Sequence, residues 1–123
     1  MTGVQTCALP IYIIVISSIW GETGAALEVA YSAVKGAQIS FVKALGKELA
    51  MDGIRVNGVA PGAINTPMMG RFSEEDLRDL ENEIPMGKLG TPDNVADVVS
   101  FLLSEKSSYI TGQMISVNGG WHT

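Results

Sequence analysis

Four consecutive β-branched residues, Ile13-Ile14-Val15-Ile16, restrict the fold of this chain more than any other feature. An unbroken apolar run of this length is typical of a strand buried on both faces, as in a parallel sheet. A parallel strand needs a crossover to reach its neighbour, and a long helical pattern follows from about residue 28 to 51. The predicted fold therefore begins with a strand and a crossover helix.

The alternation continues along the chain. A second strand is predicted over 54–60 and a last strand over 113–117, with a helix between them that begins at Thr91-Pro92. This order predicts an α/β fold with three parallel strands and right-handed crossovers. Three strands leave the first one with an unpaired edge. We therefore expect partner strands on that side, and the sequence upstream of residue 13 does not supply them.

Three other segments have predictable roles. Residues 19–29 contain two glycines and are predicted to be a loop that borders a site. Residues 63–90 form a long connection of the kind that carries binding functions, with a small helix capped by Ser73. Residues 1–12 show no helical or strand period and are expected to be a non-native or disordered leader. The folded part then covers 13–123.

Composition excludes several classes of partner. The formal net charge is −5 and no basic run is present, which argues against nucleic-acid and anionic-membrane surfaces. No apolar run approaches the roughly 18 residues that cross a bilayer. Cys7 is the only cysteine, so an internal disulfide is impossible and a cytoplasmic location fits. The acidic residues of 74–83 have no His or Cys among them, so no metal site is expected.

Tyr31, Lys35 and Ser18 are the candidate catalytic residues. Tyr31 and Lys35 lie four positions apart and share one face of the predicted helix, and Ser18 ends the first strand. A phenol is a weak base at neutral pH, and an ammonium beside it favours its ionised form. The three groups could therefore perform acid–base chemistry on a carbonyl. The structural alternative is an exposed Tyr, a solvated Lys and a strand-end Ser, and Ser17 replaces Ser18 if the strand register is shifted.

Further motifs accompany these residues at fixed spacings. They are Arg55 to Gly62 followed by Thr66, Pro85 to Pro92, Tyr109 to Gln113, and Val117 to Gly120. From residue 13 onward, the chain with this ordered set resembles the C-terminal half of a short-chain dehydrogenase/reductase. Within that family it is most similar to the 3-oxoacyl-[acyl-carrier-protein] reductases of fatty acid biosynthesis.

The resemblance implies hydride transfer between NAD(P)H and a carbonyl or secondary alcohol, with a 3-oxoacyl thioester as substrate. Tyr31 would be the general acid, Ser18 would polarise the carbonyl, and Lys35 would assist Tyr31 and bind the nicotinamide ribose. Tyr31 would also contact the cofactor. The substrate partner would be a small-molecule or acyl-carrier-bound carbonyl compound, and the full-length parent would be a homo-oligomer, either a dimer or a tetramer.

The resemblance also implies the C-terminal half of a Rossmann-like, doubly wound parallel sheet whose first strands are missing, so that 13–123 would be a partial NAD(P)-binding domain. It implies a cofactor-binding segment as well. Pro61 and Gly62 would bring the backbone beside the nicotinamide, Ile64 would meet its carboxamide through main-chain atoms, and Thr66 would bind carboxamide or phosphate oxygens. The cofactor is NADP or NAD, with NADP favoured by the resemblance. The structural alternatives are a strand-ending turn at Pro61-Gly62 and an ordinary loop residue at Thr66.

Some assignments stay open. Met68, Met69 and Phe72 are either apolar contacts of a substrate lid or plain packing, and Trp20 either lines the substrate mouth or packs on the surface. Asn57 is expected to be structural. The chain has no glycine-rich dinucleotide motif. The alternative functions are thus a catalytically incompetent fragment and a dehydrogenase of a sugar or small alcohol.

Overall fold

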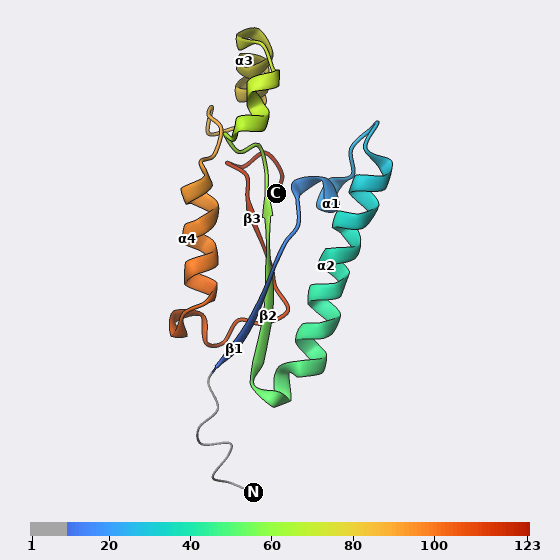
Figure 1. Ribbon diagram of the computed structural model, residues 1–123, viewed down its shortest axis with the longest axis vertical. Coiled ribbons are helices and arrows are strands. Elements are labelled where there is room, and N and C mark those ends of the chain that lie inside the picture. Colours follow the sequence, from blue (N-terminus) through green and yellow to red (C-terminus); the bar gives the residue numbers. More distant parts are fainter. Residues whose placement is uncertain (1–9) are drawn as a thin grey trace, which may run out of the picture.

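A three-stranded parallel sheet forms the centre of the computed structural model, which describes residues 10–123 (Figure 1). Strand β1 (Ile11–Ile16) pairs with β2 (Ile54–Pro61), and β2 pairs with β3 (Met114–Val117). Both pairings are parallel, and the strand order is β1-β2-β3. The predicted parallel α/β sheet is therefore confirmed, with the apolar second strand at its centre.

The first strand begins two residues earlier than predicted. Ile11 and Tyr12 lie opposite Ile54 and Arg55, so the folded part does not begin at residue 13. Isoleucine and tyrosine both favour strands, and β2 is long enough to pair with them. The rest of the predicted leader, residues 1–9 with Cys7, lies outside the described residues.

Two helices follow β1. The predicted loop at 19–29 is partly wrong, because Ile19–Thr23 forms a short helix, α1, whose N-cap is Ser18. Helix α2 (Val29–Leu49) is the predicted crossover and ends in a 3-10 turn. Gly53 then adopts a φ of 74°, the left-handed conformation expected of a glycine beyond a helix C-terminus.

The second half of the chain contains two capped helices. Helix α3 (Glu74–Glu83) begins at Ser73, whose side chain accepts from the Asp76 amide as predicted. Helix α4 (Pro92–Leu102) begins at Thr91, which forms a reciprocal capping box with Asn94. Two 3-10 segments, Pro67–Arg71 and Glu105–Ser107, precede α3 and follow α4.

Helices α2 and α4 lie on opposite faces of the sheet (Figure 1). Both connections step across the sheet in the same direction, from β1 to β2 and from β2 to β3. Two right-handed crossovers of this kind would place both helices on one face. The prediction of uniformly right-handed crossovers is therefore wrong. The order of elements along the chain does not state which face each helix covers.

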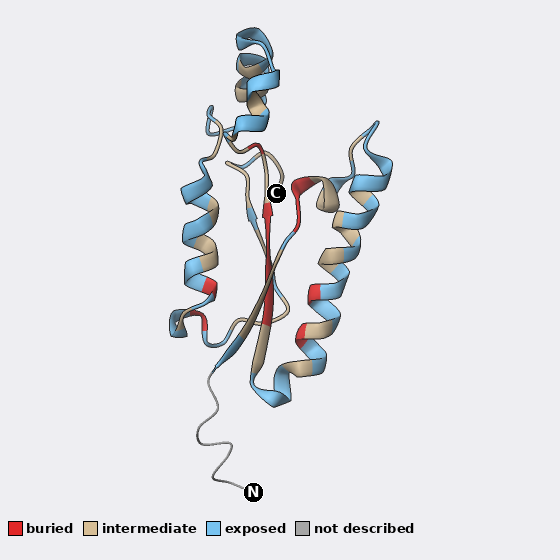
Figure 2. Ribbon diagram, in the orientation of Figure 1, coloured by how far each residue is buried: buried red, intermediate tan, exposed pale blue. Residues whose placement is uncertain are grey.

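The buried residues lie mainly along β2 and at the helix positions that face it (Figure 2). Val42 of α2, Val56 and Val59 of β2, and Leu102 of α4 are completely buried. Asn57 lies among them; its amide donates to the Ile110 carbonyl and its Oδ1 accepts from Gln113, as expected of a structural residue. Helix α3 has no buried residue and projects beyond the sheet (Figures 1 and 2). None of the described helices is both long and apolar enough to cross a membrane.

Candidate active site

A cavity of about 770 Å³ lies beyond the carboxyl ends of β1 and β2. This is the edge of an open α/β sheet at which ligands ordinarily bind. Five of the predicted site residues line it, namely Ser18, Tyr31, Gly62, Ile64 and Thr66. Residues that follow two different strands are thus brought together with one residue of helix α2 (Val29–Leu49) at a single site.

Ser18 lines the cavity, and the proton of its hydroxyl is free to form a hydrogen bond. The residue is 8% exposed, and its Oγ accepts from the Trp20 amide at 3.1 Å, which caps α1. A serine hydroxyl has one proton and two lone pairs, so this bond uses a lone pair and leaves the proton uncommitted. The hydroxyl can therefore donate to an oxygen atom in the cavity.

Ser17 has a different task. Its hydroxyl donates to the Lys35 carbonyl at 2.7 Å, and its amide donates to the Val59 carbonyl at 2.8 Å. The side chain is 4% exposed and is not part of the cavity lining. Ser17 thus ties the end of β1 to α2 and β2, and the structure favours Ser18 over Ser17 as the site residue.

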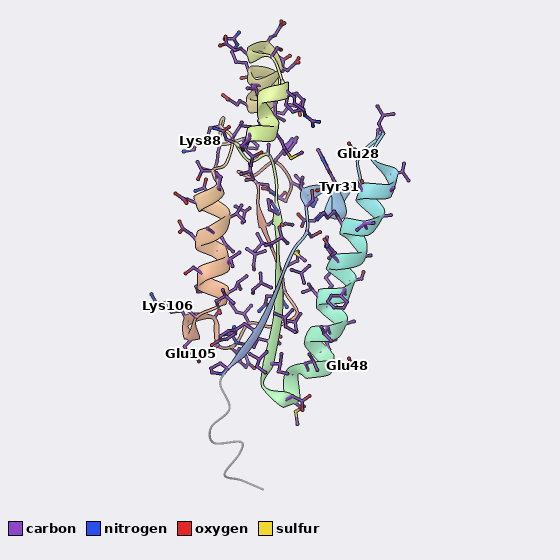
Figure 3. The ribbon with its side chains drawn as sticks, viewed as in Figure 1. Glu28, Tyr31, Glu48, Lys88, Glu105 and Lys106 are labelled. Carbon is purple, nitrogen blue, oxygen red and sulfur yellow. The ribbon has the colours of Figure 1, made fainter. Side chains whose placement is uncertain are left out.

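Tyr31 and Lys35 lie on the face of α2 that is directed toward α1 and the end of β1. Figure 3 shows Tyr31 beside α1, at the carboxyl end of the sheet. The Lys35 ammonium lies 5.5 Å from the centre of the Tyr31 ring, and its Nζ donates to the Ile16 carbonyl at 3.3 Å. Lys35 therefore contacts Tyr31 but does not line the cavity itself.

A glycine allows α1 to approach α2 closely at this point. A Cβ atom on Gly21 would lie 2.6 Å from the Lys35 carbonyl carbon. No side chain fits at that distance, so only glycine permits the observed packing. Gly21 thus sets how near the segment that carries Ser18 lies to the helix that carries Tyr31.

The segment after β2 presents backbone groups to the cavity. Gly62 donates to the Val117 carbonyl at 2.9 Å, and a Cβ there would lie 2.7 Å from the Asn118 Cβ. Ile64 forms a parallel bridge with Gly90, made by the Ala63 carbonyl and the Asn65 amide. In such a bridge the amide and carbonyl of the central residue point away from the partner. The backbone groups of Ile64 are therefore free of this bridge.

Thr66 and Pro61 complete the predicted segment. Thr66 lines the cavity, and its hydroxyl makes no capping bond to the 3-10 segment that follows it. Pro61 is the last residue of β2, pairs with Val117, and is not part of the lining. Its position matches the predicted strand-ending turn.

Apolar side chains form much of the cavity wall. Met68, Met69 and Phe72 line it, and so does Trp20. Trp121 also lines it but is absent from the predicted site. The sequence holds only part of the signal, because Asn118-Gly119-Gly120 predicts a turn after the last strand but not the contact of Trp121 with Trp20.

In the described part of the chain, no group of three or more His, Cys, Asp or Glu side chains is arranged to hold a metal ion. The polar groups that converge on the cavity are hydroxyl, phenol and backbone groups, with the exposed charged residues Glu28, Arg71 and Asp76 at its border. The arrangement can therefore bind and protonate an oxygen atom of a ligand with the chain's own residues.

Comparisons with known proteins identify the family. The family model described as Enoyl-(Acyl carrier protein) reductase matches residues 11–122. An uncharacterized oxidoreductase of Bacillus subtilis is 62% identical over 110 residues, which are 89% of this chain and 46% of that protein. The 3-oxoacyl-[acyl-carrier-protein] reductase of Aquifex aeolicus is 50% identical over 108 residues, 88% of this chain and 44% of the relative.

Solved structures of the same family match this chain as well. A 3-oxoacyl-[acyl-carrier protein] reductase from Brucella melitensis superposes with a TM-score of 0.86 at 40% identity, over 91% of this chain and 42% of that one. A short-chain dehydrogenase/reductase of the same organism, described as a glucose/ribitol dehydrogenase, gives 0.85 at 38% identity, over 91% of this chain and 45% of that one. The chain spans about half the length of the relatives it matches. It belongs to the short-chain dehydrogenase/reductase family and is similar to the 3-oxoacyl-[acyl-carrier-protein] reductases within it.

Proposed function

We propose that this chain carries the catalytic segment of an NAD(P)-dependent oxidoreductase that reduces the keto group of a 3-oxoacyl thioester. The observation that carries the proposal is that Ser18 and Tyr31 line the same cavity. The Lys35 ammonium lies 5.5 Å from the centre of the Tyr31 ring. The relatives described as 3-oxoacyl-[acyl-carrier-protein] reductases support the thioester as substrate.

The three side chains have separate tasks in this proposal. The uncommitted Ser18 proton donates to the keto oxygen and fixes its position, since Trp20 holds the Ser18 Oγ from the other side. The Tyr31 hydroxyl gives its proton to the same oxygen as negative charge develops there. Lys35 stabilises the phenolate that Tyr31 becomes, because its ammonium is held beside the ring by the Ile16 carbonyl.

The residues present fit one end of a nicotinamide dinucleotide. When bound, the cofactor supplies the hydride that adds to the keto carbon. The free backbone groups of Ile64 suit its carboxamide, and the uncapped Thr66 hydroxyl suits a carboxamide or phosphate oxygen. The absence of a Cβ at Gly62 lets this backbone pack against Asn118 at the edge of the cavity. NADP is the proposed form, from the likeness to the 3-oxoacyl reductases.

A dehydrogenase of a sugar or small alcohol is the second candidate. A specific observation supports it, because a glucose/ribitol dehydrogenase superposes as well as the reductase does. The apolar lining by Met69, Phe72 and Leu80 supports the acyl substrate instead. Hydroxyl groups of a sugar would lose hydrogen bonds to water against such side chains.

The proposed enzyme acts as a homo-oligomer. Helix α2 leaves Val34 and Phe41 more than half exposed, and a second subunit would cover such a surface. The partner in the reaction is a thioester of an acyl carrier or of a small-molecule thiol.

The test is a chimera in which the N-terminal part of the Bacillus subtilis relative precedes residues 11–123. NADPH oxidation is followed with 3-oxobutanoyl thioester and with an enoyl thioester, and NADP⁺ reduction is followed with ribitol. The proposal predicts turnover of the 3-oxoacyl thioester above both alternatives. Faster turnover of ribitol would establish the second candidate, and faster turnover of the enoyl thioester would contradict carbonyl reduction.

A further inference from the structure

We propose that Trp121, in the C-terminal segment, is a specificity-determining residue. Together with Trp20 it forms an aromatic wall of the substrate cavity that binds the hydrocarbon chain of an acyl group. The inference rests on the proposed function and adds the feature that distinguishes long acyl groups from short ones.

The two indole rings are in contact at the cavity. Their centroids lie 5.3 Å apart with an interplanar angle of 66°, an edge-to-face geometry, and both side chains line the cavity. Edge-to-face pairs at this separation are favourable beyond the area they bury. Trp20 follows Ser18 by two residues, and its amide donates to the Ser18 Oγ. The wall is therefore directly connected to the group that would hold the reacting oxygen.

The turn before Trp121 fixes the position of its ring. Asn118 accepts from the Gly120 amide through Oδ1 at 2.9 Å and from the Trp121 amide through its carbonyl at 3.1 Å. Its Nδ2 donates to the His122 carbonyl at 3.0 Å. Gly119 and Gly120 have φ values of 64° and 87°, which favour glycine. The indole is thus placed by a hydrogen-bonded turn, which lowers the entropy lost when a ligand binds.

The same turn also positions the opposite side of the cavity. The Gly119 carbonyl accepts from the Met86 amide at 3.1 Å, and a Cβ on Gly119 would lie 2.8 Å from Ile84 Cγ2. Ile84 ends helix α3, whose Leu80 lines the cavity together with Phe72. One turn therefore holds both the aromatic wall and the end of the lid segment.

The distribution of polarity suits a hydrocarbon chain. The charged residues that border the cavity, Glu28, Arg71 and Asp76, are exposed, whereas Trp20 and Trp121 are half-buried. A ligand with an apolar chain can bury it against the indoles without leaving hydrogen-bonding groups unpaired. A polyol could not, because each hydroxyl moved from water to an apolar wall loses its partners.

The experiment measures binding of reaction products, which requires no turnover. Calorimetry with the chimera and NADPH, which cannot accept a hydride from these products, gives the Kd of 3-hydroxyoctanoyl and 3-hydroxybutanoyl thioesters, and their ratio reports contacts with the longer chain. We expect the parent to bind the longer product more tightly and Trp121→Leu to reduce this preference about tenfold. Trp121→Phe keeps an aromatic ring and should stay within about threefold of the parent.

The control is Tyr109→Leu, which removes a fully exposed aromatic ring away from the cavity lining and should leave the ratio unchanged. An unchanged ratio in folded Trp121→Leu would overturn the inference, as would a parent with no preference for the longer product. If Trp121→Leu does not fold, Trp20→Leu must show the same loss. A chimera that oxidises ribitol but neither binds nor forms 3-hydroxyacyl thioesters would instead refute the proposed function.

Discussion

The Ser17 hydroxyl donates a 2.7 Å hydrogen bond to the backbone carbonyl of Lys35, and this bond ties β1 to the helix that carries Tyr31. Ser17→Ala removes the bond from a site that is almost fully buried. We expect the free energy of unfolding to fall by about 1 kcal/mol. Urea denaturation of the chimera measures it, with Ser100→Ala on the exposed side of α4 as the control. Equal stability of the two variants would show that the bond does not stabilise the fold.

Ser18→Ala tests the two tasks of the neighbouring serine. The variant loses the side-chain cap of α1 and the hydroxyl that can donate a hydrogen bond into the cavity. We expect kcat/KM for the 3-oxoacyl thioester to fall by about 10²–10³, the usual cost of removing one donor to a developing oxyanion. Ser18→Thr retains both functions of the hydroxyl and should keep most of the rate. An active Ser18→Ala would restrict Ser18 to capping.

The contact between α1 and α2 leaves no room for a side chain at Gly21. Gly21→Ala places a Cβ against the Lys35 backbone, so we expect a loss of stability of about 1–3 kcal/mol, together with lower activity because Ser18 moves relative to Tyr31. Gly70→Ala is the matched control, since a Cβ there meets nothing within 4 Å. Thermal unfolding and initial rates of both variants test this. Similar behaviour of the two would contradict the close packing.

Tyr12 should give stability a dependence on alkaline pH. Its hydrogen bond to Glu105, together with desolvation, raises the pKa of Tyr12, and Arg55 offsets this only in part. Because the pKa of Tyr12 is raised by folding, its contribution to stability is fully present below the pKa of the unfolded state, about 10. The contribution is lost as the pH rises through the pKa of the folded state. The stability difference between parent and Tyr12→Phe should therefore shrink above about pH 10.

The measurement is urea denaturation of both proteins at several alkaline pH values. Tyr109→Phe serves as the control, because Tyr109 is fully exposed. That variant should follow the parent across the range. A difference for Tyr12→Phe that stays constant with pH would show that the bond to Glu105 does not shift the titration.

The elements of the fold could be predicted because their signals are local. The apolar run Ile13–Ile16, the glycine at 53 and the caps at Ser73 and Thr91 each specify a strand or a helix end from neighbouring residues alone. The faces covered by α2 and α4 could not be predicted, since they depend on contacts between distant segments. The short helix α1 was missed because five residues with an internal glycine give no helical period.

The site was predictable to a similar extent. Tyr31 and Lys35 share a helix, and Ser18 follows a strand whose end defines the ligand edge, so spacing and topology predict where these residues lie, whereas their proposed roles come from the resemblance. Trp121 lies in the tail, and its position depends on the turn at Asn118 and on packing against Trp20. Such a contact between segments about one hundred residues apart has no periodic signal in the sequence.

Tyr31→Phe in the chimera tests the central claim most directly. The substitution removes only the hydroxyl that would give its proton to the keto oxygen, and the ring beside Lys35 is retained. Initial rates of NADPH oxidation with 3-oxobutanoyl thioester give kcat/KM for the variant and for the parent, with Tyr109→Phe as control. We expect a fall of about 10²–10⁴ for Tyr31→Phe and no change for the control. A Tyr31→Phe variant that keeps the parent's rate would contradict the account of this site.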